Sequence, residues 1–319
     1  MSNSKKETGS CFRTSIGGQA LMEGILMRGP KKQAIVCRTA DGLVEKTEEL
    51  KFIKDKYPIL GWPLIRGCAI FLSSLVNGMN ALTYSASLIP LEEQGEPDKL
   101  DAWIEAHFPE EKAQKLIIGT AVVLGIALAM FLFIFLSAAI VGLIPALRVN
   151  YLTRNLSEGL VRIVILLVYM KLCCMVPDVK RLFAYHGAEH KTIFCYEHGK
   201  ELTVENVRPE SRFHPRCGTS FLLVVVVVSI LVNSVVRVDN TFARMGCHLL
   251  LLPVVVGIAY EINRWCGLHD NWLSAALSAP GKWLQHMTTN EPDDGMIECA
   301  IRAMQLVIPE EKGSDEWGK

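Results

Sequence analysis

Residues Leu116–Leu147 read LIIGTAVVLGIALAMFLFIFLSAAIVGLIPAL, and this stretch contains no charged side chain. A helix needs about 20 apolar residues to cross the roughly 30 Å hydrocarbon core of a bilayer, so this segment is long enough to span a membrane. Three further apolar runs follow it along the chain, at Gly159–Val176, Thr219–Val236 and Met245–Tyr260. The sequence therefore predicts a mainly α-helical, polytopic membrane protein with about four transmembrane helices.

The composition of the whole chain agrees with a membrane location. The protein has 319 residues, 50% of them hydrophobic, and its mean hydropathy is +0.27. Its 33 basic and 33 acidic residues balance, so the net charge gives no reason to expect nucleic-acid binding. Residues 1–15 are polar and basic, and they lack the apolar core of a signal peptide. The ten cysteines follow no disulfide spacing, which favours reduced thiols in regions that face the cytoplasm.

The segment Ile59–Leu91 determines the number of crossings, because it is largely apolar but carries polar residues such as Arg66 and Asn80. Basic residues are concentrated in the N-terminal region and in the 178–218 loop, and the positive-inside tendency places both in the cytoplasm. Five crossings would put that loop outside. Four crossings keep both regions inside if Ile59–Leu91 is a re-entrant or interfacial hairpin that packs against the bundle at Asn77-Gly78. We therefore expect four crossings.

Four regions follow from this topology. We expect a cytoplasmic N-terminal region, then the apolar hairpin with an acidic helix around Trp103, then a four-helix membrane domain that carries the 178–218 loop, and finally a cytoplasmic tail. The boundaries that we expect for these regions are 1–58, 59–115, 116–264 and 265–319.

Local patterns predict the structure of the first and last regions. Ala34–Arg38 and Leu43–Thr47 flank Asp41-Gly42, a pair of residues that favours the turn of a β-hairpin. In the tail, apolar residues recur at helical spacing between Ile297 and Ile308. Pro292 and the two aspartates after it suit the first turn of that helix. We expect a small β-containing region at one end and an amphipathic helix at the other.

The segment Tyr185–Lys191 reads YHGAEHK and carries the strongest chemical signal in the chain. On a helix, His186 and His190 face the same way, with Glu189 beside them. Two imidazoles at this spacing can bind one transition metal, and a neighbouring carboxylate can take a proton from metal-bound water. The order His-x-x-Glu-His is also the inverted form of the zincin motif. The plainer alternative is a basic helix next to the membrane whose histidines sit in water.

Additional ligand types lie elsewhere in the chain. His214 and Cys217 precede the next apolar run, so the two ends of the 178–218 loop would converge if these residues joined the histidine pair. Glu261 ends the last apolar run and corresponds to the distant glutamate that inverted zincins use as third ligand. The sequence does not decide among these three. Glu23 follows a Gly-rich stretch that could form a loop placing this carboxylate over the site as a second catalytic residue, although glycines beside a hairpin are usually turns.

Taken together, these motifs resemble the bacterial YqhQ-like family, over nearly the whole chain. The matching stretches are Ile16–Gly24, Met27–Pro30, Tyr185–Lys191, His214–Phe221, Tyr260–Arg264 and Gln285–Pro292. That family is generally described as predicted metal-dependent membrane enzymes. The resemblance implies metal dependence and a place in the bacterial cytoplasmic membrane, but no particular reaction. The positions that match its polar motifs are Glu23, His186, Glu189, His190, His214, Cys217, Glu261 and Arg264.

These observations lead to one functional hypothesis and two alternatives. We expect a hydrolase that uses a divalent transition metal, with zinc as the expected ion, and Glu189 as general base. The expected partners are membrane lipid and an unidentified substrate, and self-association into a homo-oligomer is compatible with the sequence. One alternative is a transporter or channel in which His186, His190, Glu261 and Arg264 line a path. The other is a membrane scaffold with a structural metal site.

Overall fold

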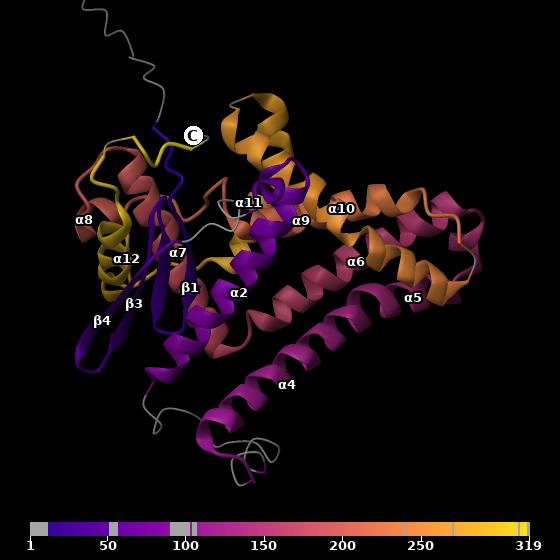
Figure 1. Cartoon of the computed structure of the whole chain (residues 1–319). Helices are drawn as coiled ribbons and strands as arrows, with labels where there is room; N and C mark the ends of the chain where they lie inside the picture. The colour runs from indigo at the N-terminus through magenta and orange to yellow at the C-terminus, as the bar shows by residue number, and fades with distance from the viewer. Residues whose placement is uncertain are drawn as a thin grey trace, which may run out of the picture. The chain divides into compact units, whose positions relative to one another are not determined.

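The computed structural model in Figure 1 describes residues 12–50, 57–89, 103, 107–238, 240–269, 271–311 and 313–317. The chain forms two compact units. The first unit consists of residues 1–88, 173–223 and 260–319, and the second consists of residues 89–172 and 224–259. Because three separate stretches build the first unit, residues that are far apart in the sequence become neighbours there.

An antiparallel sheet with strand order β1-β2-β3-β4 lies in the first unit. The predicted hairpin is confirmed, since Ala34 pairs with Thr47 and Arg38 pairs with Leu43. Gly42 supplies the positive φ of 119° that the turn needs. The Gly-rich stretch forms the first two strands and the turn between them rather than an open loop, because its backbone pairs with itself. The strands are β1 (Gly17–Leu21), β2 (Gly24–Arg28), β3 (Lys32–Thr39) and β4 (Gly42–Glu49).

Two helices, α7 (Pro177–Glu197) and α12 (Asp294–Val307), contribute to the core that lies against this sheet. In Figure 1 both lie beside the indigo strands. The predicted C-terminal helix is confirmed, and Asp293 caps it by accepting a hydrogen bond from the backbone N–H of Met296. Burial of one apolar stripe per helix gives the first unit its core. Its members include Ile25, Met27, Val36, Tyr185, Ala188, Ile297, Ala300 and Met304.

Two helical elements of the first unit differ from the sequence predictions. The segment that we expected to form an apolar hairpin contains a short 3-10 helix, η1 (Pro58–Gly61), and one continuous helix, α2 (Ile65–Ser87). The prediction of a hairpin is therefore wrong. Gly78 does not turn the chain; it lets α2 approach the sheet so closely that a Cβ there would lie 2.4 Å from Oε1 of Gln19. The expected packing of Gly78 on a helix bundle is thus replaced by packing on β1.

A further helix, α11 (Trp272–Thr288), occupies part of the expected tail. A capping box between Asn271 and Ser274 begins it, with each side chain bonded to the backbone N–H of the other residue. The short helix α8 (Val204–Val207) lies in the 178–218 loop and begins with the side chain of Thr203 as its N-cap. Both helices belong to the first unit.

The second unit is built from apolar helices. The helices α9 and α10 pass from one unit into the other. Helix α4 continues through the π-helical turn η2 into α5, as Figure 1 shows. The bounds are α4 (Glu110–Met130), η2 (Phe131–Leu136), α5 (Ser137–Leu143), η3 (Pro145–Arg148), α6 (Tyr151–Cys173), α9 (Gly218–Ser234) and α10 (Thr241–Leu268). Most of the acidic helix that we expected around Trp103 lies outside the described residues.

Two stretches are long and apolar enough to cross a membrane, Leu116–Leu143 and Phe242–Leu268. A third candidate is the bent pair of α6 and α7, whose axes differ by 99°. The apolar helix α9 has 17 residues and is shorter than a typical span. The part of the chain that the structure describes thus has two or three helices compatible with a membrane protein, where the sequence alone suggested four.

Candidate metal centre

Helix α7 places the histidine motif inside the first unit. Pro177 occupies its first turn, and Asp178 adds the acidic side chain that suits a helix N-terminus. The rings of His186 and His190 then lie one turn apart, with their centroids separated by 4.4 Å. This part of α7 is largely buried, so the plainer alternative of two histidines in water does not describe it.

Cys217 joins the histidine pair from the other end of the 178–218 loop. Its Sγ lies 3.1 Å from Nε2 of His186. One ligand atom from each of His186, His190 and Cys217 lies within 4.8 Å of the other two, which is a group that could hold a metal ion. Two imidazoles and a thiolate match the ligand types that zinc prefers.

Backbone carbonyls orient both imidazoles. Nδ1 of His186 lies 2.7 Å from the carbonyl oxygen of Thr288, and Nδ1 of His190 lies 2.5 Å from that of Arg212. A carbonyl oxygen only accepts hydrogen bonds, so each Nδ1 must carry the proton. The Nε2 atoms then present lone pairs, which is the usual orientation of histidines that bind metal.

The surroundings of Nε2 of His190 indicate whether these residues fit a metal ion. His190 is only 1% exposed, yet its Nε2 has no well-aligned hydrogen-bond partner among the described residues, although the ring is close enough to the Cys217 thiol to lower the pKa of that thiol. A buried polar atom without a partner costs roughly 1–3 kcal/mol. A metal ion bound between His190, His186 and Cys217 would give the Nε2 lone pair of His190 a partner. The three side chains therefore fit a metal site.

Charge also favours a cation. Burial opposes ionisation of Cys217, but the two imidazoles next to it hold the pKa of the thiol well below its ordinary value. Burial likewise opposes protonation of His186, but Cys217 raises the pKa of that imidazole to about 9. Without a metal, both shifts describe a pair in which Nε2 of His186 carries a proton that faces the Cys217 thiolate; a cation bound there would replace this proton and use the lone pair. The thiolate is the form of cysteine that binds metal.

Glu189 lies next to this group but holds a different position. Its Oε1 accepts a hydrogen bond of 2.9 Å from the backbone N–H of Gly18 in β1, and its Oε2 has no partner among the described residues. Burial raises the pKa of this carboxyl, although His186 and His190 act against the rise. The approach depends on the glycine, because a Cβ at Gly18 would lie 3.0 Å from Cδ of Glu189.

Several residues that shape the site were missed by our sequence reasoning. The buried side chain of Gln285 in α11 accepts from the backbone N–H of His214 and donates to the carbonyl of His214 and to Oγ of Ser220. It thereby fixes the segment that carries Cys217. Gly187 lets the chain after α11 lie against α7, since a Cβ there would be 2.0 Å from the carbonyl oxygen of Asn290. The QHMTTNEP stretch was a signal for this segment, but it did not reveal these roles.

His214 is buried near the site without belonging to the three-residue group. Its Nε2 lies 3.6 Å from Oε2 of Glu197 and 3.3 Å from Nη2 of Arg216. Burial lowers the pKa of His214 to about 4. Burial raises the pKa of Glu197, but His214 and Arg216 together hold it below its ordinary value.

Glu23 lies at the turn between β1 and β2 and faces cations. Its carboxylate forms an ion pair with Arg181 and accepts a hydrogen bond of 3.1 Å from the Tyr185 hydroxyl. Glu23 has a φ of 50°, in the left-handed region that non-glycine residues rarely adopt. Glu23 thus links the sheet to α7 through Arg181 and Tyr185, and Tyr185 is the residue directly before His186.

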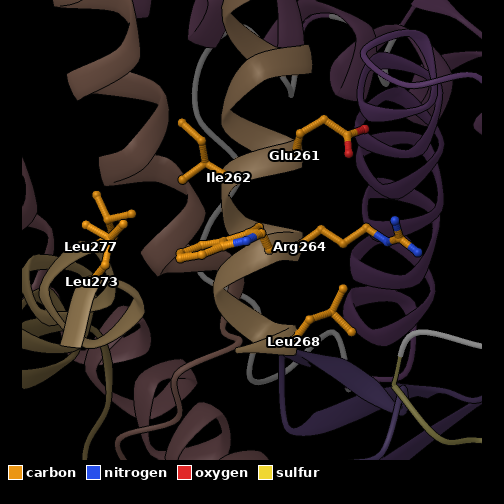
Figure 2. Close-up of a pocket in the computed structure, with 7 residues that line it drawn as sticks. Glu261, Ile262, Arg264, Leu268, Leu273 and Leu277 are labelled. Atoms are coloured by element: carbon orange, nitrogen blue, oxygen red, sulfur yellow. The ribbon is translucent and has the colours of Figure 1, made fainter. Parts of the chain in front are cut away.

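Glu261 is engaged by α2. It accepts a hydrogen bond of 2.7 Å from Nε of Arg66 and one of 3.3 Å from the backbone N–H of Leu64. It lines an apolar pocket of about 500 Å³ at the end of α10. In Figure 2 the side chains of Glu261 and Arg264 extend to one side of α10, and Leu273 and Leu277 lie on the other side. The transport alternative needed His186, His190, Glu261 and Arg264 in one path, and nothing in these contacts supports such a path.

Comparisons with known proteins give the family of the chain. Residues 62–310 match the family described as "Protein of unknown function (DUF1385)". The chain is 32% identical over 306 residues to the "Uncharacterized protein YqhQ" of Bacillus subtilis (strain 168), which covers 94% of each chain. No solved structure matches the chain. Since the match covers most of its length, the chain belongs to this YqhQ-like, DUF1385 family.

Proposed function

We propose that the protein is a metal-dependent membrane enzyme, and that its reaction is a hydrolysis. One observation carries this proposal. The proton positions of His186 and His190 are fixed by backbone carbonyls, so both Nε2 lone pairs are directed to the group that also contains the Cys217 thiol. Such a preset donor arrangement in a buried place indicates a cation rather than ordinary packing.

The ligands would be His186 and His190 through Nε2 and Cys217 through Sγ. Two nitrogens and one sulfur favour zinc over magnesium or calcium, which prefer oxygen ligands. A zinc ion supplies Lewis acidity, which polarises a carbonyl or phosphoryl oxygen and makes water acidic near neutral pH. Three protein ligands leave one tetrahedral position open, which is the pattern of catalytic zinc sites.

Glu189 would act as the general base. Its Oε1 is held by the N–H of Gly18, while Oε2 is buried and has no partner among the described residues. Burial raises the pKa of the carboxyl above its ordinary value, which makes it a stronger base than an exposed carboxylate. Glu23 would support the site indirectly, because its bond to Tyr185 positions the residue before His186.

We further propose a bacterial cytoplasmic membrane location, four crossings and a site on the cytoplasmic side. Basic residues in the 178–218 loop support this orientation through the positive-inside tendency. Single-cysteine variants at Lys200 and Asn240 should react with a membrane-impermeant thiol reagent from opposite sides. Labelling of position 200 from outside intact cells would exclude the orientation.

A second candidate function is a membrane scaffold with a structural metal. The observation in its favour is that the group joins α7 to the segment before α9, and both His190 and Cys217 (7% exposed) are buried. Structural zinc sites are closed by a fourth protein ligand. In this alternative the unpartnered Oε2 of Glu189 would be that ligand.

Elemental analysis of the detergent-purified protein tests both candidates. The enzyme proposal predicts about one zinc per chain in the wild type and in Glu189→Gln. It also predicts that Glu189→Gln loses at least about 100-fold in the rate of any metal-dependent hydrolysis of p-nitrophenyl ester or phosphodiester probes. Loss of metal in Glu189→Gln would favour the structural site. A wild-type protein that retains no transition metal and takes up none would exclude both.

A further inference from the structure

The second unit contains a buried group of charged side chains that the proposed function does not use. Glu158 in α6 is 1% exposed, and three guanidinium groups surround its carboxylate. Nη2 of Arg244 in α10 lies 2.9 Å away, Nε of Arg154 lies 3.6 Å away, and Nη2 of Arg162 lies 3.8 Å away. We call these four residues, together with His248, the arginine cluster.

The arginine cluster has an excess of positive charge. Three guanidinium groups and one carboxylate give a formal charge of +2. Charges in apolar helices are costly unless opposite charges balance them. Buried ionisable residues in a membrane-spanning region therefore indicate function more often than packing.

Two N–H groups in the cluster lack acceptors among the described residues, and both carboxylate oxygens of Glu158 lack an aligned donor there although guanidinium groups surround them. Arg162 donates from Nη2 to Nδ1 of His248 at 3.1 Å. Nδ1 must accept that bond, so the proton of the neutral ring lies on Nε2. That Nε2 is buried without a partner among the described residues, and so is Nη1 of Arg244. Arg244 is 2% exposed and His248 is 8% exposed, so water does not replace the partners at the surface.

The surrounding contacts hold these donors in place. Nε of Arg162 donates to Oγ of Ser137 in α5 at 3.3 Å. Nδ2 of Asn155 donates to the carbonyls of Asn233 and Val236 at 2.9 and 3.0 Å, which ties α6 to the end of α9. Four helices thus fix a net-positive group with two unused donors. The chemistry that would complete it is an anion with several acceptor oxygens.

We propose that the arginine cluster binds a phosphate group. A phosphate oxyanion balances the excess charge, and its oxygens match guanidinium donors in number and geometry. Arg154 and Arg244 each occupy the fourth position of their helices, in the first turns of α6 and α10. Apolar side chains beside them are exposed, including Leu152, Leu156 and Phe242. The phosphate can come from a phospholipid headgroup or from a soluble anion.

Binding titrations on the full-length protein in detergent separate the two sources. The probes are dioleoylphosphatidylglycerol, dioleoylglycerol with the same acyl chains but no phosphate, and inorganic phosphate. Saturable binding of the phospholipid but not of inorganic phosphate would identify a headgroup site, and binding of inorganic phosphate a site for soluble anions. Either result supports the proposal if dioleoylglycerol fails to bind. Equal binding of both lipids, with no binding of phosphate, would overturn it.

Two variants with opposite expected effects distinguish binding from a structural role. Arg244→Gln removes a donor and a charge, and it should weaken phosphate binding by about 10- to 100-fold. Glu158→Gln removes the competing carboxylate and should tighten binding several-fold. A cluster that serves only to hold the helices together predicts lower stability in both variants and no gain in affinity. Failure of Glu158→Gln to tighten binding in a folded protein would therefore overturn the proposal, even if Arg244→Gln does not fold.

The matched control is Arg237→Gln, which removes the same charge from an exposed position in the segment between α9 and α10. It should leave binding unchanged. An equal loss in Arg237→Gln and Arg244→Gln would show general electrostatic attraction and overturn a specific site. Treatment with a chelator should not alter phosphate binding, so failure of the metal proposal would be distinguishable from failure of this one.

Discussion

The two buried polar groups of this protein differ in the charge of the ligand that would complete them. In the first unit, His190 leaves a nitrogen lone pair and Glu189 leaves a carboxylate oxygen. In the second unit, Arg244 leaves an N–H group in a cluster of three guanidinium groups and one carboxylate, which has an excess of positive charge even though the oxygens of Glu158 also lack an aligned donor among the described residues. Lone pairs attract cations, whereas N–H donors with an excess of positive charge attract anions. Two groups that are equally buried are therefore expected to bind ligands of opposite charge, a metal ion in the first unit and a phosphate in the second.

The two groups are held by similar devices. An amide side chain ties distant backbone segments together in each unit, Gln285 near the metal site and Asn155 near the arginine cluster. Gln285 satisfies one N–H and one carbonyl of the same residue, His214, whereas Asn155 only donates to carbonyls. Substitutions of the metal ligands and of the two supporting amides, Gln285 and Asn155, should therefore have effects of different size.

The largest effect is expected from His190→Ala. This change removes a lone pair from the three-residue group without changing the arginine cluster. Loss of a partner behind a metal ligand already costs about 10- to 100-fold in metal affinity, so loss of the ligand itself should cost at least about 100-fold. Zinc content and competition with a chromogenic chelator measure the affinity.

His286→Ala is the control for that change. His286 lies on the exposed side of α11 and stacks on Phe213, so its removal should leave zinc content unchanged. Equal zinc loss in both variants would mean that surface imidazoles, rather than the buried group, bind the metal.

The next largest effect is expected from Gln285→Leu. A leucine leaves the buried N–H and carbonyl of His214 without their partners, and each such group costs roughly 1–3 kcal/mol. We expect a loss of about 3 kcal/mol in the free energy of unfolding, measured by denaturant titration in detergent. Asn155→Leu should cost less, because water or a neighbouring N–H can reach the carbonyls at the end of α9 more easily. A greater loss of unfolding free energy in Asn155→Leu than in Gln285→Leu would show that Asn155 is the more important of the two supporting amides.

A smaller effect is expected from Gly187→Ala. The new Cβ would lie 2.0 Å from the carbonyl oxygen of Asn290, so the segment after α11 must move. Overpacking of this kind costs about 1–3 kcal/mol, which a gain in helix propensity of up to about 1 kcal/mol partly offsets. Because Thr288, whose carbonyl orients His186, lies only two residues before Asn290, zinc affinity should fall as well. Gly218→Ala has open space around its Cβ and should lower neither stability nor zinc affinity.

The smallest effect is expected from Arg208→Ala. The ion pair between Arg208 and Asp294 is as short as 2.7 Å, but more than half of each side chain is exposed. Exposed ion pairs contribute little to stability because water and salt screen them. We expect no resolvable change in the thermal unfolding midpoint. A clear decrease in the unfolding midpoint would show that an exposed ion pair stabilises this protein. Burial would then not be what distinguishes the two charged groups.

Local patterns in the sequence predicted much of the first unit. Asp41-Gly42 indicated the turn of the β3–β4 hairpin, and the spacing of Ile297, Ala300 and Met304 indicated α12. The four-residue spacing of His186 and His190 placed both rings on one face of a helix. These predictions succeeded because they depend on backbone periodicity, which neighbouring residues determine.

Long-range choices could not be predicted in the same way. The sequence offered His214, Cys217 and Glu261 as third ligands, and the structure gathers only Cys217 with the histidine pair. Glu261 is instead paired with Arg66, which lies 195 residues away in the chain. Polar residues interrupt the apolar segment around Gly78, and this pattern favours a hairpin. The segment instead forms one continuous helix that packs on β1 at Gly78.

The sequence by itself determined the apolar helices, the hairpin, the C-terminal helix and the face on which the histidines lie. Tertiary structure alone decided which atoms those histidines meet. The proton positions of His186 and His190 depend on the carbonyls of Thr288 and Arg212, and the donors of the arginine cluster depend on α5, α6 and α10 together. Periodicity is a property of adjacent residues, whereas an unsatisfied lone pair or N–H exists only after distant segments have been brought together and water has been excluded.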